Sequence, residues 1–368
     1  MAGGRLGPAI LRRFHFQPRT GGLDCGHTKR ENTGMSSAII VNPDVEAHWS
    51  LAADHALAIW RKDGPVDFVR LEPSDRRSVG EVLPDHKRVT RLLSMGVRFT
   101  ESCIQGFPAL KEAAVIDTGQ DLDWLQARGV KRIKHPSEGF WGQSVAECAL
   151  ALTLCGLRRI PQLHHAALTD TTIWDYTPDG GVGRPGARAH QYCDDPRFAS
   201  GTIEGKRVRI VGAGNIGSRY ASFAKLLGAE VAAWDPFATE PCFHRAGSRR
   251  EFHLDRLVQD AEIFAPMLPL TPATEGLVTA KHIDALPSGC LVVLVTRALI
   301  CDMATLRRRV LEDELSLAAD VFDVEPLPLD DPLLGRHNVV HTPHIAGRTR
   351  QANEQWVEML LAQFSPMG

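Results

Sequence analysis

Three glycines and one acid are spaced in a way that can bind a dinucleotide. The glycines are Gly212, Gly214 and Gly217, and the acid is Asp235. Gly212 permits a tight turn, Gly214 lets a pyrophosphate approach the backbone, and Gly217 lets a helix pack closely on a strand. The phosphates would then meet N–H groups at a helix N-terminus. Asp235 follows at the roughly 20-residue offset at which a carboxylate can accept hydrogen bonds from the adenosine ribose.

The residues around this turn predict the elements that position it. A short β-branched apolar run at 208–211 indicates a buried strand, and apolar residues at helical spacing follow the turn as far as Leu227. A second strand is expected at 230–234, so that Asp235 stands at its end. Within the turn, Asn215 and Ile216 are also expected at the cofactor. The alternative interpretation is an ordinary strand-to-helix turn, because a GxGxxG pattern alone is short.

Strands and helices alternate along the rest of the chain, which predicts an α/β fold with parallel sheets. Strands are expected at 38–41, 66–71, 110–116, 262–268, 291–295 and 317–321, and helices at 49–60, 144–157 and 304–311. In the helix at 144–157, Ser144 and Glu147 predict a capping box. This helix is apolar nearly all round, which favours burial between domains or between the subunits of a homodimer. The Gly-, Pro- and Arg-rich stretch at 178–196 predicts a surface loop.

The length and composition of the chain indicate a globular protein and give no support for a nucleic-acid-binding or membrane-spanning one. A chain of 368 residues suggests about two domains, and 43% hydrophobic with 23% charged residues is globular composition. The net charge of −2 gives no electrostatic case for a nucleic-acid partner, and no apolar run approaches the roughly 20 residues of a membrane helix. The eight cysteines show no CxxC or other metal-binding spacing, so we expect reduced thiols in a cytoplasmic protein and no metal.

Residues 1–34 differ from the chain that follows. They are rich in Gly and Arg, with only Asp24 and Glu31 as acids. An Arg-rich, acid-poor start weakly resembles a transit peptide, but apolar periodicity is absent. The simpler interpretations are a disordered N-terminal extension or an upstream start codon with Met35 as the true beginning, and we favour these.

Five short motifs follow one another along the chain after residue 36. They are SVAE at 144–147, PLTPAT at 269–274, LVVLVTRALICD with Arg297, DVFDVEPLP with Glu325 and HTPHIAGRT with His344. In this order and spacing, from about residue 37 to residue 364, the sequence resembles the D-isomer-specific 2-hydroxyacid dehydrogenases, a family of NAD(P)-dependent enzymes.

The resemblance implies a catalytic set of Arg297, Glu325 and His344. Reducing a 2-oxo acid makes the carbonyl oxygen anionic, so a proton must come from a group that titrates near neutrality, and His344 is implied as that group. Glu325 beside it would stabilise the imidazolium and hold one tautomer. Arg297, directly after the strand expected at 291–295, would bind the substrate carboxylate with two prongs and polarise the carbonyl. The implied reaction is reversible, NAD(H)-linked reduction of a 2-oxo acid to a D-2-hydroxy acid.

The resemblance also implies further contacts with the cofactor. Asp320 and the Thr296 backbone would face the nicotinamide, and the turn that ends at Gly347 would close over it. Alternatively, Asp320 caps a strand end and Gly347 serves only the turn. The further cofactor residues implied by the PLTPAT motif are Pro269 and Thr274. Asp235 resembles the acid of the NAD-preferring members, since a carboxylate would repel the 2′-phosphate of NADP.

The expected architecture is two Rossmann-like, doubly wound parallel-sheet domains, with one inserted into the other. Residues 143–344 would form the dinucleotide-binding domain. Residues 35–142 and 345–368 would form the substrate domain. The active site would lie in the cleft between them, where closure can exclude water.

The sequence departs from the family pattern near the implied site. Leu294 and Val295 replace the usual Asn-Thr, Ala298 replaces a Gly, and Asp117 replaces the first Gly of the substrate loop. If the family Gly has a positive φ, Ala298 would cost about 1 kcal/mol. A rival function is therefore an NAD-binding regulatory or interaction protein with weak or no turnover. A formate dehydrogenase is less favoured, because that branch carries glutamine where this chain has Glu325.

Overall fold

The computed structural model describes residues 36–83, 86–116, 118–136, 139–192 and 194–366. The extension expected over residues 1–34 and the substituted Asp117 lie outside these residues. The fold below belongs to one compact unit within residues 35–368. No helix among the described residues has the length and apolar character needed to cross a membrane.

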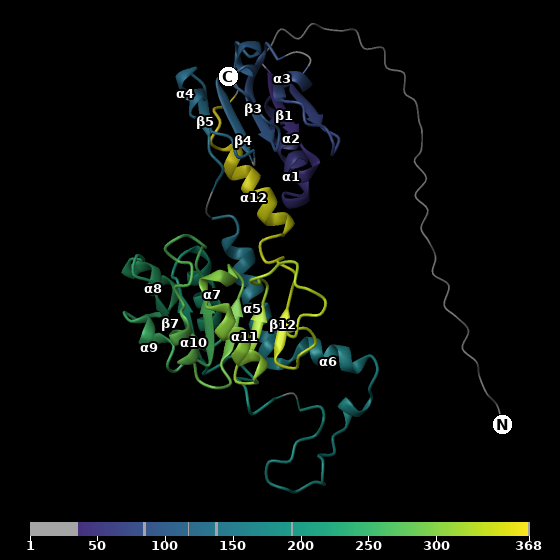
Figure 1. Ribbon diagram of the computed structural model, residues 1–368, viewed down its shortest axis with the longest axis vertical. Coiled ribbons are helices and arrows are strands. Elements are labelled where there is room, and N and C mark those ends of the chain that lie inside the picture. The colour runs from purple at the N-terminus through teal and green to yellow at the C-terminus, as the bar shows by residue number, and fades with distance from the viewer. Residues whose placement is uncertain (1–35, 84–85, 117, 137–138, 193, 367–368) are drawn as a thin grey trace, which may run out of the picture. The chain divides into compact units, whose positions relative to one another are not determined.

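The first sheet has five parallel strands in the order β2-β1-β3-β4-β5 (Figure 1). The strands are β1 (Ser36–Val41), β2 (Val66–Arg70), β3 (Val89–Met95), β4 (Glu112–Ile116) and β5 (Lys131–Ile133). Alternate residues of β1 point to opposite faces, with Ile39 in one core cluster and Ile40 in the other.

Each face of this sheet has its own helices. One core contains apolar residues of α1 (Pro43–His48), α2 (Ala52–Asp63) and α12 (Arg350–Leu361). The other is built with α3 (Val79–Val82), the 3-10 turn η1 (Cys103–Gly106) and α4 (Trp124–Ala127). The sheet is therefore buried on both sides, as expected for parallel strands.

The second sheet has seven parallel strands in the order β12-β11-β10-β9-β6-β7-β8 (Figure 1). The strands are β6 (Arg207–Val211), β7 (Glu230–Trp234), β8 (Arg249–Arg250), β9 (Ile263–Pro266), β10 (Leu291–Leu294), β11 (Ser316–Ala319) and β12 (Val339–His341). Because β6, β9 and β10 are neighbours and parallel, the loops that follow them lie at one edge of the sheet.

Helices also cover both faces of the second sheet. One core contains residues of α5 (Gly142–Arg158), α7 (Asn215–Leu226) and α8 (Glu240–Ala246). The other contains residues of α9 (Leu254–Leu257), α10 (Ala280–Asp284) and α11 (Met303–Leu311). Two parallel sheets wound on both faces confirm the predicted α/β class.

One predicted helix is interrupted, and strand β3 was missed. The helix expected at 49–60 is interrupted, because Leu51 has φ 68° and α2 begins only at Ala52. Strand β3 was not predicted, because the charged Arg91 interrupts its apolar pattern. That side chain is only 5% exposed, and its guanidinium donates from Nε to Ser37 Oγ at 3.0 Å and lies over the Trp60 ring.

The capping box expected at the start of α5 is absent. The helix begins at Gly142, two residues earlier, and the Ser144 hydroxyl donates to the main-chain oxygen of Ala346 at 2.6 Å. Glu147 accepts a hydrogen bond from Gln143 instead. The buried face of α5 contributes to the core of the second sheet, so this part of its apolar surface is used within the chain.

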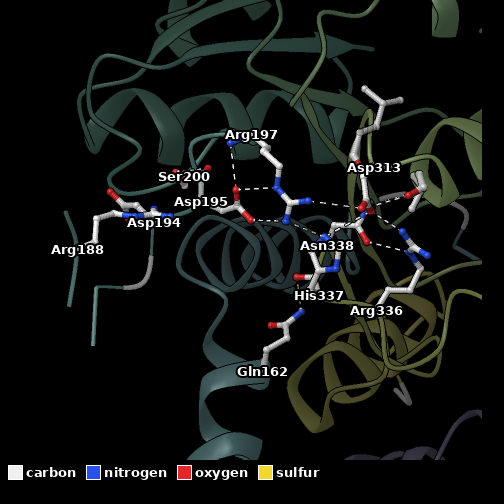
Figure 2. A network of polar contacts seen from close by, with 12 residues as sticks. Gln162, Arg188, Asp194, Asp195, Arg197, Ser200, Asp313, Arg336, His337 and Asn338 are labelled. Atoms are coloured by element: carbon white, nitrogen blue, oxygen red, sulfur yellow. Dashed lines mark hydrogen bonds and ion pairs between the residues drawn. The ribbon is translucent and has the colours of Figure 1, made fainter. Parts of the chain in front are cut away.

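The segment between α5 and β6 contains α6 (Ile160–Ala167) and the 3-10 turn η2 (Thr172–Trp174). Within the expected loop at 178–196, the described residues form neither helix nor strand. A network of polar contacts then holds the residues between this loop and β6 (Figure 2). Arg197 pairs with Asp195 at 2.8 Å and with Asp313 at 3.6 Å, and Asp313 also accepts from Arg336.

Candidate active site

The glycine turn has the backbone geometry that a bound pyrophosphate requires. Gly212 follows β6 with φ 103°, and a Cβ there would lie 2.8 Å from the Met267 main-chain oxygen. A Cβ on Gly217 would lie 2.1 Å from the Gly212 oxygen. Gly214 is exposed, and no heavy atom would lie within 4 Å of a Cβ on it. The turn is therefore tight on its inner side and open at Gly214, which fits the dinucleotide.

Asp235 links the end of β7 to this turn. Its Oδ2 accepts from the Ala213 N–H at 2.8 Å, and its Oδ1 accepts from the N–H groups of Phe237 and Ala238 at 2.9 and 3.0 Å. A carboxylate has about four acceptor sites, so capacity remains for a ribose hydroxyl. The structure places Asp235 at the turn, as predicted from the spacing.

The hydroxyls of two implied cofactor residues form hydrogen bonds to main-chain oxygens of the chain itself. The Thr274 hydroxyl donates to the Pro269 oxygen at 2.5 Å and so closes the PLTPAT loop after β9. Thr296 follows β10, is buried, and donates its hydroxyl to the Pro266 oxygen at 3.3 Å. These side chains shape loops at the edge of the sheet that carries the glycine turn, and their main-chain groups are what they can offer a cofactor.

The other implied cofactor residues lie near α5 and α7. Ile216 is half-buried and packs against the core beneath α7. The side chain of Asn215 lies so close to Gly142 that a Cβ there would be 2.5 Å from it. Gly347 has the Trp141 ring beside it, 3.2 Å from the position of a Cβ. Gly142 and Gly347 therefore permit close packing of this region.

His344 and Glu325 form a direct pair. His344 Nδ1 lies 2.7 Å from Glu325 Oε2, and Glu325 Oε1 accepts from the Phe322 N–H at 2.8 Å. Burial alone would raise the pKa of Glu325, but the hydrogen bond from His344 leads the effects that lower it overall. With Nδ1–H donating to the carboxylate, Nε2 is the ring nitrogen that can exchange a proton with a substrate.

Asp320 holds the turn that carries His344. Its Oδ1 accepts from the Thr342 hydroxyl at 2.5 Å and from the Ile345 N–H at 2.8 Å, and its Oδ2 accepts from the Ala346 N–H at 2.8 Å. The carboxylate is fully buried. His344 has φ 55°, a left-handed conformation that costs about 1–2 kcal/mol in a non-glycine residue. The sequence implied a contact of Asp320 with the nicotinamide, but it gave no indication of this anchoring role or of Thr342.

Arg297 lies three residues after the end of β10 at Leu294, at the carboxyl edge of the sheet. It is exposed, and its Nη1 donates to the Thr296 oxygen at 2.6 Å. Its positive charge contributes, after the hydrogen bonds and the charge of His344, to lowering the pKa of Glu325. The strain expected at Ala298 is absent, because this residue begins the 3-10 turn η3 (Ala298–Ile300) without a positive φ.

A second arginine fixes the loop that carries Glu325. Arg307 of α11 donates to Asp323 Oδ1 at 3.2 Å and also to Asp331, so it connects the two ends of the loop. Sequence reasoning missed this residue. The sequence signal for it was the number of acids in this loop, such as Asp323 and Asp331, because they need a nearby cation to balance their charge.

Comparison with known proteins points to dehydrogenases that act on 2-hydroxy acids. Residues 183–346 match the family described as D-isomer specific 2-hydroxyacid dehydrogenase, NAD binding domain. A D-3-phosphoglycerate dehydrogenase from Archaeoglobus fulgidus is 29% identical over 315 residues, covering 84% of this chain and 54% of that protein. A hydroxypyruvate reductase from Blautia hydrogenotrophica is 26% identical, covering 68% of this chain and 74% of that protein. The chain spans about half the length of the phosphoglycerate dehydrogenases it matches.

Solved structures share the fold. A phosphoglycerate oxidoreductase from Rhizobium etli superposes with a TM-score of 0.64 at 19% identity, covering 90% of this chain and 97% of that one. At this identity the likeness concerns the fold alone. The glycine turn, the motif order and the family match over residues 183–346 agree, and together they support the D-isomer-specific 2-hydroxyacid dehydrogenase family for this chain.

Proposed function

We propose that this chain transfers a hydride between NAD(H) and a small 2-oxo acid, forming a D-2-hydroxy acid. The observation that carries the proposal is the 2.7 Å contact between His344 Nδ1 and Glu325 Oε2. It fixes the ring tautomer and leaves Nε2 to deliver a proton, which is the arrangement that general acid catalysis requires. Bound NADH supplies the hydride for the carbonyl carbon.

Each residue of the set has one task in this proposal. His344 donates its Nε2 proton to the substrate oxygen during reduction and takes it back during oxidation. Glu325 stabilises the imidazolium. Arg297 binds the substrate carboxylate through two parallel N–H groups. Asp320 acts through His344, by holding the turn on which the imidazole stands.

The proposal includes the domain organisation. Residues 143–344 form the dinucleotide-binding domain, inserted into a substrate domain made of 35–142 and 345–368. The support is that Trp356 and Leu360 of α12 belong to the same core cluster as Ile39 of β1 and Trp60 of α2. We also propose a cytoplasmic location, which the free cysteines support: Cys103, Cys148, Cys155, Cys242, Cys290 and Cys301.

A panel of 2-oxo acids tests the reaction. Each acid is mixed with NADH and the purified chain, and consumption of NADH is followed by its absorbance. We expect turnover of at least one acid, with the D-hydroxy acid as product. Turnover of none, together with tight NADH binding, would instead favour the NAD-binding regulatory protein.

Cofactor choice should depend on Asp235. We expect NADH to be preferred over NADPH, since a carboxylate beside the ribose repels a 2′-phosphate. Asp235→Ser should relax this preference by on the order of 1–3 kcal/mol, measured as the ratio of kcat/KM for the two cofactors. The unmodified protein is the reference, and equal use of both cofactors by it would contradict the assignment.

We propose that the segment 160–192 forms the interface of a homodimer. Six large apolar side chains of this segment are exposed: Ile160, Leu168, Trp174, Tyr176, Val182 and Tyr192. Exposed apolar surface is typical of an interaction site, and twofold dimers are the commonest assemblies of soluble proteins.

Light scattering after size-exclusion chromatography tests this interface. We expect a mass of about twice 40.4 kDa for the unmodified chain. The double variant Trp174→Asp, Tyr176→Asp should be monomeric, because two buried carboxylates would destabilise the interface. Leu226→Asp is the control, since Leu226 is also a highly exposed apolar residue but lies on α7. A wild-type monomer would contradict the proposal.

A further inference from the structure

One arginine beside the glycine turn has no acidic partner among the residues that the structure describes. Arg219 lies one helical turn after Asn215 on α7, and its Nη1 donates to the Asn215 main-chain oxygen at 3.2 Å and to the side-chain oxygen of the same residue. Within the described part of the chain, no Asp or Glu oxygen lies within 4.0 Å of this guanidinium. The side chain is half-buried, so solvent screens its charge only in part.

This charge stands at the positive end of a helix. α7 has 12 residues, begins at Asn215 and has no acidic residue in its first turn. The N-terminus of a helix carries roughly half an elementary positive charge, so a cation there is unfavourable unless an anion accompanies it. The guanidinium and the helix end therefore place positive charge close together, and Asp235, whose carboxylate accepts from the Ala213 N–H of the turn, forms no ion pair with Arg219.

Close packing holds the guanidinium at this place. The side chain of Asn215 is confined by Gly142, where a Cβ would lie only 2.5 Å from it. Asn215 in turn accepts from Arg219 through two oxygens, so the arginine is directed back toward the turn. The open backbone at Gly214, with no heavy atom within 4 Å of a Cβ position, lies one residue before Asn215.

We propose that Arg219 binds the pyrophosphate of NAD, adding a charged donor to the N–H groups of the glycine turn. The ligand class is a diphosphate diester, whose negative oxygens accept charge-assisted hydrogen bonds from a guanidinium. Asn215 positions the guanidinium and lies between it and the turn. The i to i+4 spacing of Asn215 and Arg219 is the sequence signal for this arrangement.

Calorimetric binding of three ligands tests the proposal without turnover. NADH and ADP-ribose contain the pyrophosphate, and adenosine does not. For Arg219→Met we expect Kd for NADH and ADP-ribose to rise roughly 5- to 50-fold, because a hydrogen bond to a charged group is lost. Kd for adenosine should not change. Added salt should weaken NADH binding less in this variant than in the unmodified chain.

Two further variants complete the experiment. Arg219→Lys keeps a charge but loses the planar donor pair, so its loss should be smaller than that of Arg219→Met. Lys225→Met removes an exposed charge from the same helix and should leave all three affinities unchanged. Unfolding midpoints are compared for every variant, and Arg219→Gln replaces Arg219→Met if the latter does not fold.

The result that overturns the proposal is unchanged binding of ADP-ribose by the variant that lacks the charge. Equal weakening of adenosine and ADP-ribose would also overturn it, because this would assign a purely structural role to Arg219. Both measurements are independent of the oxo acid, so they stand even if the proposed reaction fails.

Discussion

His344→Ala should lower kcat/KM for reduction of the oxo acid by roughly 10²–10⁴-fold, which is the usual contribution of a general acid. The imidazole is paired through Nδ1 to Glu325, so the lost Nε2 proton has no replacement in the pair. NADH binding should change little. His48→Ala, which removes an exposed histidine at the end of α1, should leave the kinetics unchanged.

The same pair predicts a pH dependence whose sign differs between the two directions. Reduction needs the protonated ring, so reductive kcat/KM should fall as pH rises, whereas oxidation needs the neutral ring and should fall as pH drops. The lowered pKa of Glu325 keeps its carboxylate ionised near neutrality, and this charge is lost only as pH falls through that lowered value. Glu325→Gln removes the charge, so both limbs of the pH profiles, the fall in reduction and the fall in oxidation, should move to lower pH.

In His344→Ala both limbs should disappear. A structural histidine would instead change the unfolding midpoint and leave the shape of the profile as it was. Identical limbs at identical pH in His344→Ala and Glu325→Gln would rule out this pair as the proton relay.

Arg297→Lys should lower kcat/KM for the oxo acid by about 10- to 100-fold, since a hydrogen bond to a charged group contributes roughly 1.5–3 kcal/mol. Lysine keeps the positive charge but cannot present two parallel donors to a carboxylate. We expect KM for the oxo acid to rise and kcat to fall, while the affinity for NADH stays the same.

Steady-state kinetics over a range of oxo-acid concentrations measures this effect. Arg308→Lys is the matched control, because Arg308 is an exposed arginine on α11 that pairs with Glu312 and Asp284. Normal kinetics in Arg297→Lys would show that Arg297 does not bind the substrate carboxylate.

Local patterns predicted much of the fold. The strand at 230–234 was predicted with its exact limits and the helix after the glycine turn was predicted, because apolar spacing and glycine positions are local signals. The capping box predicted at Ser144 is absent because Ser144 makes a contact that is not local. The hydroxyl of Ser144 is bonded to Ala346, 202 positions away in the sequence, and no local pattern contains that contact.

In the candidate site, too, some contacts were predicted and others were missed. Family motifs led to Glu325 beside His344, and the structure contains this contact, while the catalytic role stays a prediction. The supporting contacts were missed. Asp320 anchors the His344 turn and Arg307 joins the ends of the Glu325 loop, and both depend on how segments far apart in the sequence pack.

Isotope transfer shows whether the hydride of NADH reaches the oxo acid. NADH carrying deuterium at the transferable position of the nicotinamide is incubated with the chain and the oxo acid that it reduces fastest. We expect one deuterium at C2 of the product for each NADH consumed, and the D configuration at that carbon. Consumption of NADH without deuterium at C2, or an L product, would contradict this expectation.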